Sequence, residues 1–409
     1  MFSSRGIPGS RYTLFPWFML WVLALAITLQ AGQEKYAVGT TVDVVSGGTN
    51  NLNSVVATST DRPFALFYAH YPTLNLAATG AHSNLGFSYG FGLNRSVNQQ
   101  NIHSTSHQAS VSFAKSLKSK WKVTFGGSFQ LTSDAATFNA LRGIAAVPQP
   151  SSFLINSTAV NRLTRSGEAD VGVDYSLSNK SSISVSGSYG LQSYGGALPA
   201  QGLSNQQRYS GSVTYNRRTS KTDTWSVGYN GGYYTFRAFA SVASQSLRLG
   251  YSDQVRPDLT FSLSVGASQS RNYGSGAGYI GYNTSASLAK TTKTNSFSIH
   301  YNQDSGQPTG LGSVSNTRRA GIGVNQVGRT TSAFVDVSVF DSVGILGNDL
   351  GIRGAAATGN VGIFLTRKLS VQFGGEYQRT NQTQLLGFTQ KRLFVSVRYS
   401  DPKLWQFTH

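Results

Sequence analysis

Apolar and polar residues alternate along most of this chain with the two-residue period of a β-strand. Within residues 165–191 the alternation runs twice, through residues 169–177 and again through residues 183–191. The polar residues 178–181 between these two runs predict a tight turn. Each strand of this hairpin is therefore expected to face an apolar medium on one side and water on the other.

Repetition of the hairpin distinguishes a membrane barrel from a soluble β-sandwich, which would show the same local pattern. Similar hairpins recur up to residue 399, with short turns inside each hairpin and longer loops between hairpins. Transmembrane β-barrels have this asymmetry, and an even strand count places both chain ends on the side of the short turns. The pattern predicts an all-β, up-and-down antiparallel barrel of about 18 strands if residues 36–45 and 66–78 both belong to the wall, and about 16 if neither does. Pro72, which lacks an N–H, predicts an edge or a bulge in the second segment.

The composition is consistent with a wall that is half lipid-facing and half wet. Of 409 residues, 39% are hydrophobic and only 12% are charged, with 45 glycines and no cysteine. The lack of cysteine excludes a disulfide scaffold and thiolate metal sites. No boundary between domains is visible in the sequence after the N-terminal region.

The N-terminal region predicts an export signal. Arg5 and Arg11 precede an apolar run over residues 15–29, which is short for a transmembrane helix, the alternative interpretation. We therefore expect a cleaved signal peptide over residues 1–31 and a single outer-membrane barrel domain over residues 32–409.

Aromatic residues gather beside the expected short turns. Trp121 and Trp225 begin strands directly after such turns, and several tyrosines end strands on the same side. Aromatic rings with one polar tip favour the headgroup level of a membrane, so these positions predict a girdle at one interface. The tyrosines are Tyr175, Tyr215, Tyr251 and Tyr399.

A formal net charge of +18 invites a nucleic-acid interpretation, but the basic residues form no patch or helix stripe. Many lie in the expected short turns, where they either touch anionic lipid headgroups or are simply solvated. Since an exported protein rarely meets nucleic acid, we expect no nucleic-acid partner. The basic excess weakly favours anions as the solutes of a channel.

The pattern resembles the bacterial outer-membrane β-barrel family, porin-like in size, over residues 36–399. This resemblance implies a protein of the cell outer membrane whose partners are membrane lipids, small solutes in the lumen and the barrel-insertion machinery. Members commonly end on an aromatic residue, whereas this chain continues past Tyr399 to His409.

Charged residues in the polar rows are the candidates for lining the lumen. On one strand three acidic side chains share the polar face, and a lysine of the preceding strand is expected to point the same way. They either line a conduit or pair with one another and stiffen the interior. These candidates are Lys122, Glu168, Asp170 and Asp174, together with Arg162 or Arg165 near the start of the hairpin.

The longest interruption of the pattern, residues 132–163, contains many apolar residues and would not float in water. It is expected either to fold into the lumen as a constriction, with Arg142 and Arg162 as its charges, or to cap the mouth.

Neither catalysis nor metal binding is indicated. His103 and His107 would suit a metal only on a helix, and no Ser, His and Asp arrangement stands out. We expect no catalytic, cofactor-binding or metal residues. The favoured hypothesis is a passive diffusion channel for small polar or anionic solutes. The alternatives are a structural or adhesive barrel with a plugged lumen and, less favoured, an outer-membrane hydrolase with a site on the loop rim.

Overall fold

The computed structural model describes residues 35–50, 65–96, 103–132, 163–195, 205–237, 240–308, 314–346, 351–382 and 388–408. Strands and the connections between them make up these ranges. No helix within them is long and apolar enough to cross a membrane. The signal peptide expected over residues 1–31 lies outside the described residues.

The described residues form one sheet of 18 strands. In chain order the strands are β1 (Lys35–Thr49), β2 (Ala65–Thr79), β3 (Ser83–Ser96), β4 (His103–Leu117), β5 (Trp121–Thr132), β6 (Thr164–Ser178), β7 (Ser181–Tyr194), β8 (Gln206–Arg218), β9 (Asp223–Phe236), β10 (Val242–Arg256), β11 (Leu259–Asn272), β12 (Gly278–Thr291), β13 (Asn295–Pro308), β14 (Val314–Val327), β15 (Thr331–Leu346), β16 (Gly351–Phe364), β17 (Leu369–Gln382) and β18 (Phe388–Thr408).

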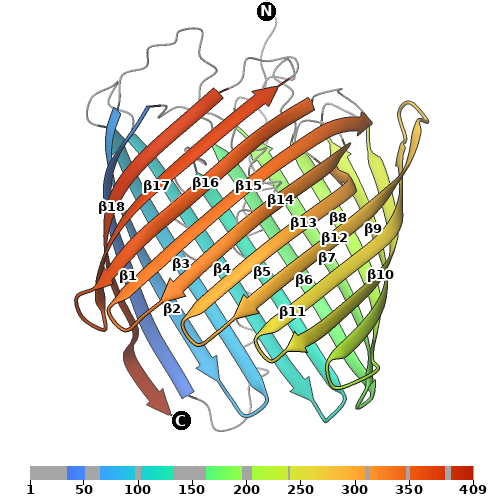
Figure 1. Cartoon of the computed structure of the whole chain (residues 1–409), viewed down its shortest axis with the longest axis horizontal. Helices are drawn as coiled ribbons and strands as arrows, with labels where there is room; N and C mark the ends of the chain where they lie inside the picture. The colour runs from blue at the N-terminus through green and yellow to red at the C-terminus, as the bar shows by residue number, and fades with distance from the viewer. Residues whose placement is uncertain are drawn as a thin grey trace, which may run out of the picture.

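The sheet closes on itself into an up-and-down barrel. Each strand pairs antiparallel with its neighbours in sequence, and β1 pairs with both β2 and β18. Figure 1 shows the tilted strands, with the short turns at the lower end of the barrel. The prediction of about 18 strands, with residues 36–45 and 66–78 both in the wall, is confirmed. We call the lower end the turn end and the opposite end the loop end.

Pro72 interrupts the wall locally without forming an edge. It keeps its partner Val42 on β1, but the ladder to β3 passes from His70↔Leu93 to Thr73↔Gly90. Tyr71 and Pro72 are therefore skipped on the β3 side, because proline has no N–H to donate there. The proline costs the barrel a short stretch of one ladder, and both neighbouring strands remain in place.

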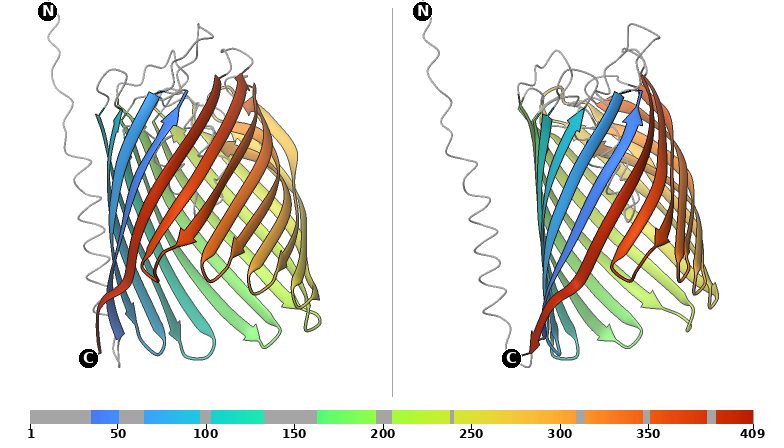
Figure 2. Two further views of the ribbon diagram at one scale, coloured as in Figure 1. Left: turned by 60° about the vertical axis from the view of Figure 1, so that its left-hand side comes forward. Right: turned by 90° about the vertical axis from the view of Figure 1, so that its left-hand side faces the viewer.

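The last strand is longer than the alternation predicted. β18 continues past Tyr399 to Thr408 and pairs with β1 to its first residue, Lys35. A register shift between Val38 and Thr40 accommodates the residues around Pro402. In Figure 2 this end of β18 runs beyond the turn that joins β16 and β17. The alternation is lost there because a bulge shifts side chains to the other face.

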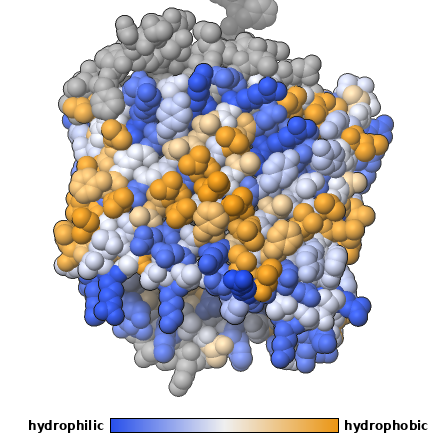
Figure 3. Space-filling view, viewed as in Figure 1, coloured by the Kyte–Doolittle hydropathy of each residue, from blue (hydrophilic) through white to orange (hydrophobic). Residues whose placement is uncertain are grey.

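The outer face carries a continuous apolar belt. Side chains in the outward rows are exposed although apolar: Val171 is 51% exposed, Leu249 54% and Val339 53%. Figure 3 shows apolar side chains concentrated in a band between more polar zones at the two ends. Water-soluble proteins rarely expose a contiguous apolar surface of this extent. The belt therefore fits the hydrocarbon core of a bilayer, where a closed barrel leaves no backbone group unpaired at an edge.

Aromatic pairs border the belt at both ends. At the turn end, the rings of Trp121 and Tyr175 are tilted against each other with centroids 4.4 Å apart, and the rings of Trp225 and Tyr251 have centroids 4.8 Å apart. These four residues belong to the girdle predicted from the sequence. A second set lies nearer the loop end and escaped the sequence analysis. It includes Tyr189 with Tyr209 at 5.1 Å and Tyr233 with Tyr273 at 6.1 Å.

Candidate functional site

Ion pairs between strands that are not neighbours establish which rows face the interior. Arg208 on β8 reaches Glu168 on β6, and Arg248 on β10 reaches Asp304 on β13. Side chains of separated strands converge on the concave face of a barrel and diverge on the convex face. The polar rows that contain these residues therefore line the interior, and the apolar rows face outward.

The first of these ion pairs crosses a glycine. The register aligns Glu168 with Gly190 and Gly190 with Arg208, so all three lie in one row across β6, β7 and β8. A Cβ on Gly190 would lie 3.7 Å from Arg208 Nε. The arginine side chain thus passes over the glycine and lies flat against the wall. In this way the pair fills the inner surface without projecting far into the passage.

The wall parts between β12 and β13 toward the loop end. Their ladder ends at Thr284↔Gln303, while β12 continues to pair with β11, and β13 with β14. Above this point Asn283 Oδ1 accepts a 2.7 Å hydrogen bond from the Ser305 backbone N–H. A Cβ on Gly281, in the inward row of β12, would lie 2.9 Å from Ser305 Oγ. The loop end of β13 therefore leans over the inner face of β12.

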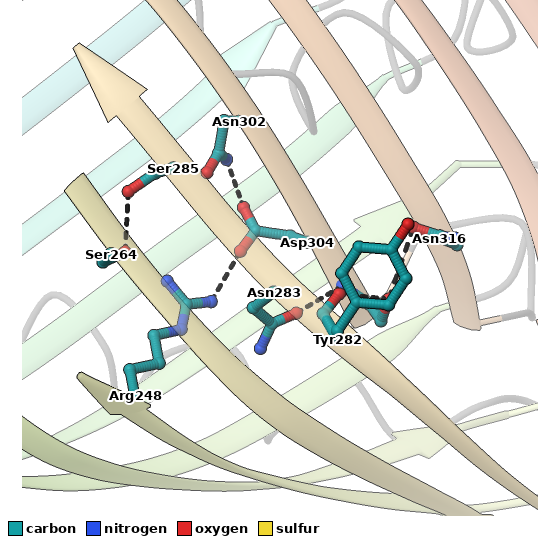
Figure 4. A network of polar contacts seen from close by, with 9 residues as sticks. Arg248, Ser264, Tyr282, Asn283, Ser285, Asn302, Asp304 and Asn316 are labelled. Carbon is teal, nitrogen blue, oxygen red and sulfur yellow. Dashed lines mark hydrogen bonds and ion pairs between the residues drawn. The ribbon is translucent and has the colours of Figure 1, made fainter. Parts of the chain in front are cut away.

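Arg248 and Asp304 hold this inward-leaning segment to β10, which is separated from β13 in the wall by β11 and β12. Arg248 Nη2 lies 2.5 Å from Asp304 Oδ1, and Asn302 also donates to the Asp304 carboxylate. Figure 4 shows Arg248 reaching across the intervening strands toward Asp304, with Asn283 beside them. A Cβ on Gly266, the register partner of Arg248, would overlap the backbone oxygen of Leu247 and lie 2.9 Å from Arg248 Cγ, so this glycine accommodates both the backbone of β10 and the arginine side chain. As with the first pair, a glycine leaves the path that an arginine occupies.

An apolar cluster continues the contact across the interior. Buried Tyr234 and Phe236 of β9 and Val242 of β10 pack with Leu346 at the end of β15. Tyr279 of β12, in the inward row, packs against the same cluster. Because Leu346 comes from a strand remote from β9 in the wall, this contact narrows the interior at the loop end. We call the loop ends of β13, β14 and β15 the inward flap.

Two further ion pairs lie on the inner face beside the closing strands. Arg398 Nε is 2.5 Å from Asp43 Oδ1, across the β1–β18 ladder. Arg392 is fully buried; its Nη1 lies 3.5 Å from Glu376 Oε2, and its guanidinium lies 5.4 Å from the centre of the Phe67 ring. Each arginine of the interior named so far is thus matched by a carboxylate.

The interior is balanced in charge although the chain is strongly basic. Apart from Lys35, the first residue of β1 and in the same inward row as Asp43, the inward rows of the described strands hold as many acidic as basic side chains. The anion preference suggested by the net charge of +18 therefore has no counterpart in the inner rows. The basic residues are Lys122, Arg208, Arg218, Arg248, Arg319, Arg392 and Arg398, and the acidic residues are Asp43, Glu168, Asp170, Asp174, Asp304, Asp336 and Glu376.

Most of the described candidates from the sequence lie in the inward rows. Lys122 is the register partner of Asp174, and Glu168 and Asp170 continue the same row of β6. The carboxylate of Asp170 covers Gly126 of β5, where a Cβ would overlap Asp170 Oδ1. These four residues form one polar strip on β5 and β6.

The remaining candidates do not join this strip. Arg165 is the register partner of Leu131, so it belongs to the outward row of β6 near the loop end. It was expected inward only because it lies close to the hairpin start, although Arg165 is in phase with the apolar positions Ala169 and Val171. Arg142 and Arg162 lie outside the described residues, as does nearly all of the long segment 132–163 that carries them.

Arg248 and Asp304 are among the charged residues of the inner face that the sequence analysis did not single out. Both occupy polar positions of an alternating strand, which was a usable signal. Their partnership was not visible, because 56 residues and two strands separate them.

The two histidines considered for a metal belong to one strand, β4. Four residues of extended chain place their Cα atoms roughly 13 Å apart. The His107 ring accepts or donates a 2.8 Å hydrogen bond with the Tyr89 hydroxyl and lies 5.0 Å from the Phe91 ring, on the outward face. The geometry therefore separates the pair that a metal would need.

A closed antiparallel barrel with an apolar belt outside and polar rows inside defines the class. The protein is a membrane-spanning β-barrel with the architecture of the bacterial outer-membrane barrels. No family model matches the chain, and no curated protein is similar to it in sequence.

Several solved outer-membrane proteins are similar in shape. OccK2 (OpdF) of Pseudomonas aeruginosa, in complex with glucuronate, has a TM-score of 0.46 at 10% identity, covering 89% of this chain and 98% of that chain. OpdK of the same organism, with vanillate, has a TM-score of 0.46 at 9% identity, covering 89% and 99%. OccAB4 of Acinetobacter baumannii has a TM-score of 0.46 at 8% identity, covering 93% and 99%. At these values the class of this protein rests on its own strand pairing and surface.

Proposed function

We propose that the protein is a porin-like passive diffusion channel of the outer membrane for small polar solutes. The polar inner face carries this proposal, since a barrel of this many strands encloses an interior wider than its own side chains fill. The channel would let solutes move down their gradient, selected by the width left beside the inward flap and by the groups on the wall. Transport of this kind needs no cofactor and no bound nucleotide.

Hydroxyl groups dominate the wall on one side of the interior. Ser186 and Ser212 lie 2.7 Å apart between β7 and β8, and Ser188 and Ser210 lie 2.6 Å apart beside them. Ser264 and Ser285 form a similar 2.7 Å contact between β11 and β12. Such hydroxyls can donate and accept, so they can replace water around an uncharged polar solute.

The charge balance of the inner face supports weak ion selectivity. The paired arginines present little free charge to a passing ion, because each carboxylate cancels most of the field of its partner. We therefore propose small neutral or zwitterionic polar molecules as the solutes, with small anions and cations passing at comparable rates.

Reconstitution into planar bilayers tests the channel. We expect stepwise conductance increments in potassium chloride and a reversal potential close to zero under a salt gradient. Swelling of liposomes that contain the protein should follow the size of neutral solutes. Folded protein that inserts, shown by heat-sensitive gel mobility, and yet gives neither conductance nor swelling would refute a channel function.

A structural or adhesive barrel is the second candidate, and the inward flap is the observation that favours it. The cluster of Tyr234, Phe236, Val242 and Leu346 joins β9 and β10 to β15, which is remote from them in the wall, and narrows the interior. Folded, inserted and non-conducting protein would support this candidate. The hydrolase candidate has less support, since His107 faces outward and bonds to Tyr89.

A further inference from the structure

Four basic residues occupy equivalent positions on the outer face of neighbouring strands. Arg318 of β14, Arg353 of β16, Arg379 of β17 and Lys391 of β18 all belong to outward rows. Each lies on the loop-end side of the apolar outward positions of its strand. On β17, Arg379 comes after Phe373 and Tyr377 in sequence, and on β18, Lys391 comes before Leu393. We call these four residues the cationic arc.

The register shows that the arc is contiguous. Arg318 and Arg353 both align with Asp341 of β15, one on each side. Arg379 aligns with Ala355, two residues from Arg353 on β16, and Lys391 aligns with Tyr377, two residues from Arg379 on β17. Diagonal neighbours at this spacing lie roughly 7 to 8 Å apart across a ladder. The four cations therefore form one surface across five adjacent strands.

The charges of the arc are exposed and only partly neutralised. The side chain of Arg353 is 78% exposed, although its Nε lies 2.9 Å from Asp341 Oδ1. Arg318, Arg379 and Lys391 are also exposed. Asp341 is the one acidic residue in the outward rows of these strands at this level, within the described residues. A single carboxylate cannot balance four cations, so the arc retains a positive excess.

The level of the arc points to a lipid partner. It lies directly beyond the apolar belt, and exposed Tyr377 within it is a residue type that prefers the headgroup region. Long arginine side chains can lay their stems along acyl chains and place the guanidinium among headgroups. A guanidinium binds phosphate through two parallel hydrogen bonds, and the arginines on β14, β16 and β17 each offer such a pair of donors. Figure 3 shows polar surface above the apolar band on this side of the barrel.

We propose that the cationic arc binds the phosphate groups of a phosphorylated lipid in the surrounding leaflet at the loop end. The site lies on the opposite face of the wall from the inner rows, so it concerns anchoring and assembly in the membrane and not the solute. The proposed lipid site requires the membrane-spanning architecture, but it does not require that the barrel conducts solutes.

Native mass spectrometry of the purified, folded barrel tests the site. The probes are lipid A carrying both phosphates and the same lipid with its phosphates removed, each titrated in detergent. We expect the wild-type protein to bind the phosphorylated form about tenfold or more tightly, as expected for several well-placed cations. The variant R318Q/R353Q/R379Q/K391Q should bind both forms equally.

A control variant removes the same formal charge at the turn end. R217Q/K293Q/R329Q/R367Q changes four exposed basic residues there and should keep the wild-type preference. Equal binding of both probes by wild type, or an equal loss in both variants, would overturn the proposal. Complete displacement of the lipid by millimolar inorganic phosphate would overturn it too, since the arc would then be a site for free anions.

Folding and function are checked on the same samples. Heat-sensitive gel mobility shows whether each variant is folded, and the double variant R353Q/R379Q replaces the quadruple variant if that protein does not fold. Single-channel conductance of the arc variant should match wild type. A silent channel with intact lipid preference would refute the proposed transport function alone, and normal conductance without lipid preference would refute the arc alone.

Discussion

Arg248 Nη2 lies 2.5 Å from Asp304 Oδ1, although β10 and β13 are separated in the wall by β11 and β12. The contact exists because β13 leaves its ladder with β12 and leans inward. Both side chains are partly exposed, Arg248 at 35% and Asp304 at 21%, so the pair lies at the edge of the passage. The pair thus holds β13 in its inward position and also neutralises two charges of the inner face.

Charge removal at this pair should change ion selectivity in opposite directions. In Asp304→Asn the unpaired Arg248 should shift the reversal potential toward anion selectivity, and in Arg248→Gln the unpaired Asp304 should shift it toward cations. The double variant restores neutrality and should return close to the wild-type value. Reversal potentials under a potassium chloride gradient measure all three. Shifts of the same sign in both single variants would show that Arg248 and Asp304 do not act as a pair.

The closing seam should be sensitive to a single methyl group at Gly39. A Cβ there would lie 2.8 Å from the backbone oxygen of Pro402, and backbone cannot rotate away. Gly39→Ala is expected to destabilise the barrel by about 1–3 kcal/mol, the usual cost of overpacking. Gly211→Ala is the matched control, because its nearest contact would be 3.7 Å away. Urea unfolding in lipid vesicles measures both, and a Gly39→Ala variant as stable as the control would contradict the seam geometry.

Trp121 should report the level of the membrane interface. Its ring packs at a tilt against the Tyr175 ring at the turn end of the belt. In a variant carrying Trp225→Phe and Trp405→Phe, the remaining fluorescence from the barrel should be quenched more strongly by spin labels near the headgroup than by labels near the acyl terminus. The complementary variant that keeps Trp225 should behave alike. Stronger quenching by the labels near the acyl terminus in either protein would contradict the level assigned to the tryptophans at the edge of the belt.

A lysine in the β16–β17 turn should make stability depend on alkaline pH. The hydrogen bond and the attraction of Asp401 raise the pKa of Lys368 above its usual 10.5. A raised pKa in the folded state stabilises at pH values below the unfolded pKa, and that contribution is lost as pH rises through the folded pKa. Between about pH 9 and about pH 12, wild type should therefore lose more stability than Lys368→Gln. Chemical denaturation across this range measures the difference, and parallel curves would exclude the contribution.

The sequence by itself determined the class of fold and most of the wall. A period of two in hydrophobicity can be satisfied only by strands with one apolar and one wet face, and the alternation of short and long connections orients them. For this reason the hairpin of β6 and β7, the strand count, the inward strip from Lys122 to Asp174 and the girdle at Trp121 and Trp225 could all be predicted.

Only the tertiary structure decided how the interior is shaped and neutralised. Periodicity describes each strand against its own faces and contains no information about contacts across two strands. The inward flap, the Arg248–Asp304 pair and the continuation of β18 to Thr408 therefore emerged from register and closure. Arg165 is a different case, because extending the alternation of Ala169 and Val171 back by four residues already places it on the outward face.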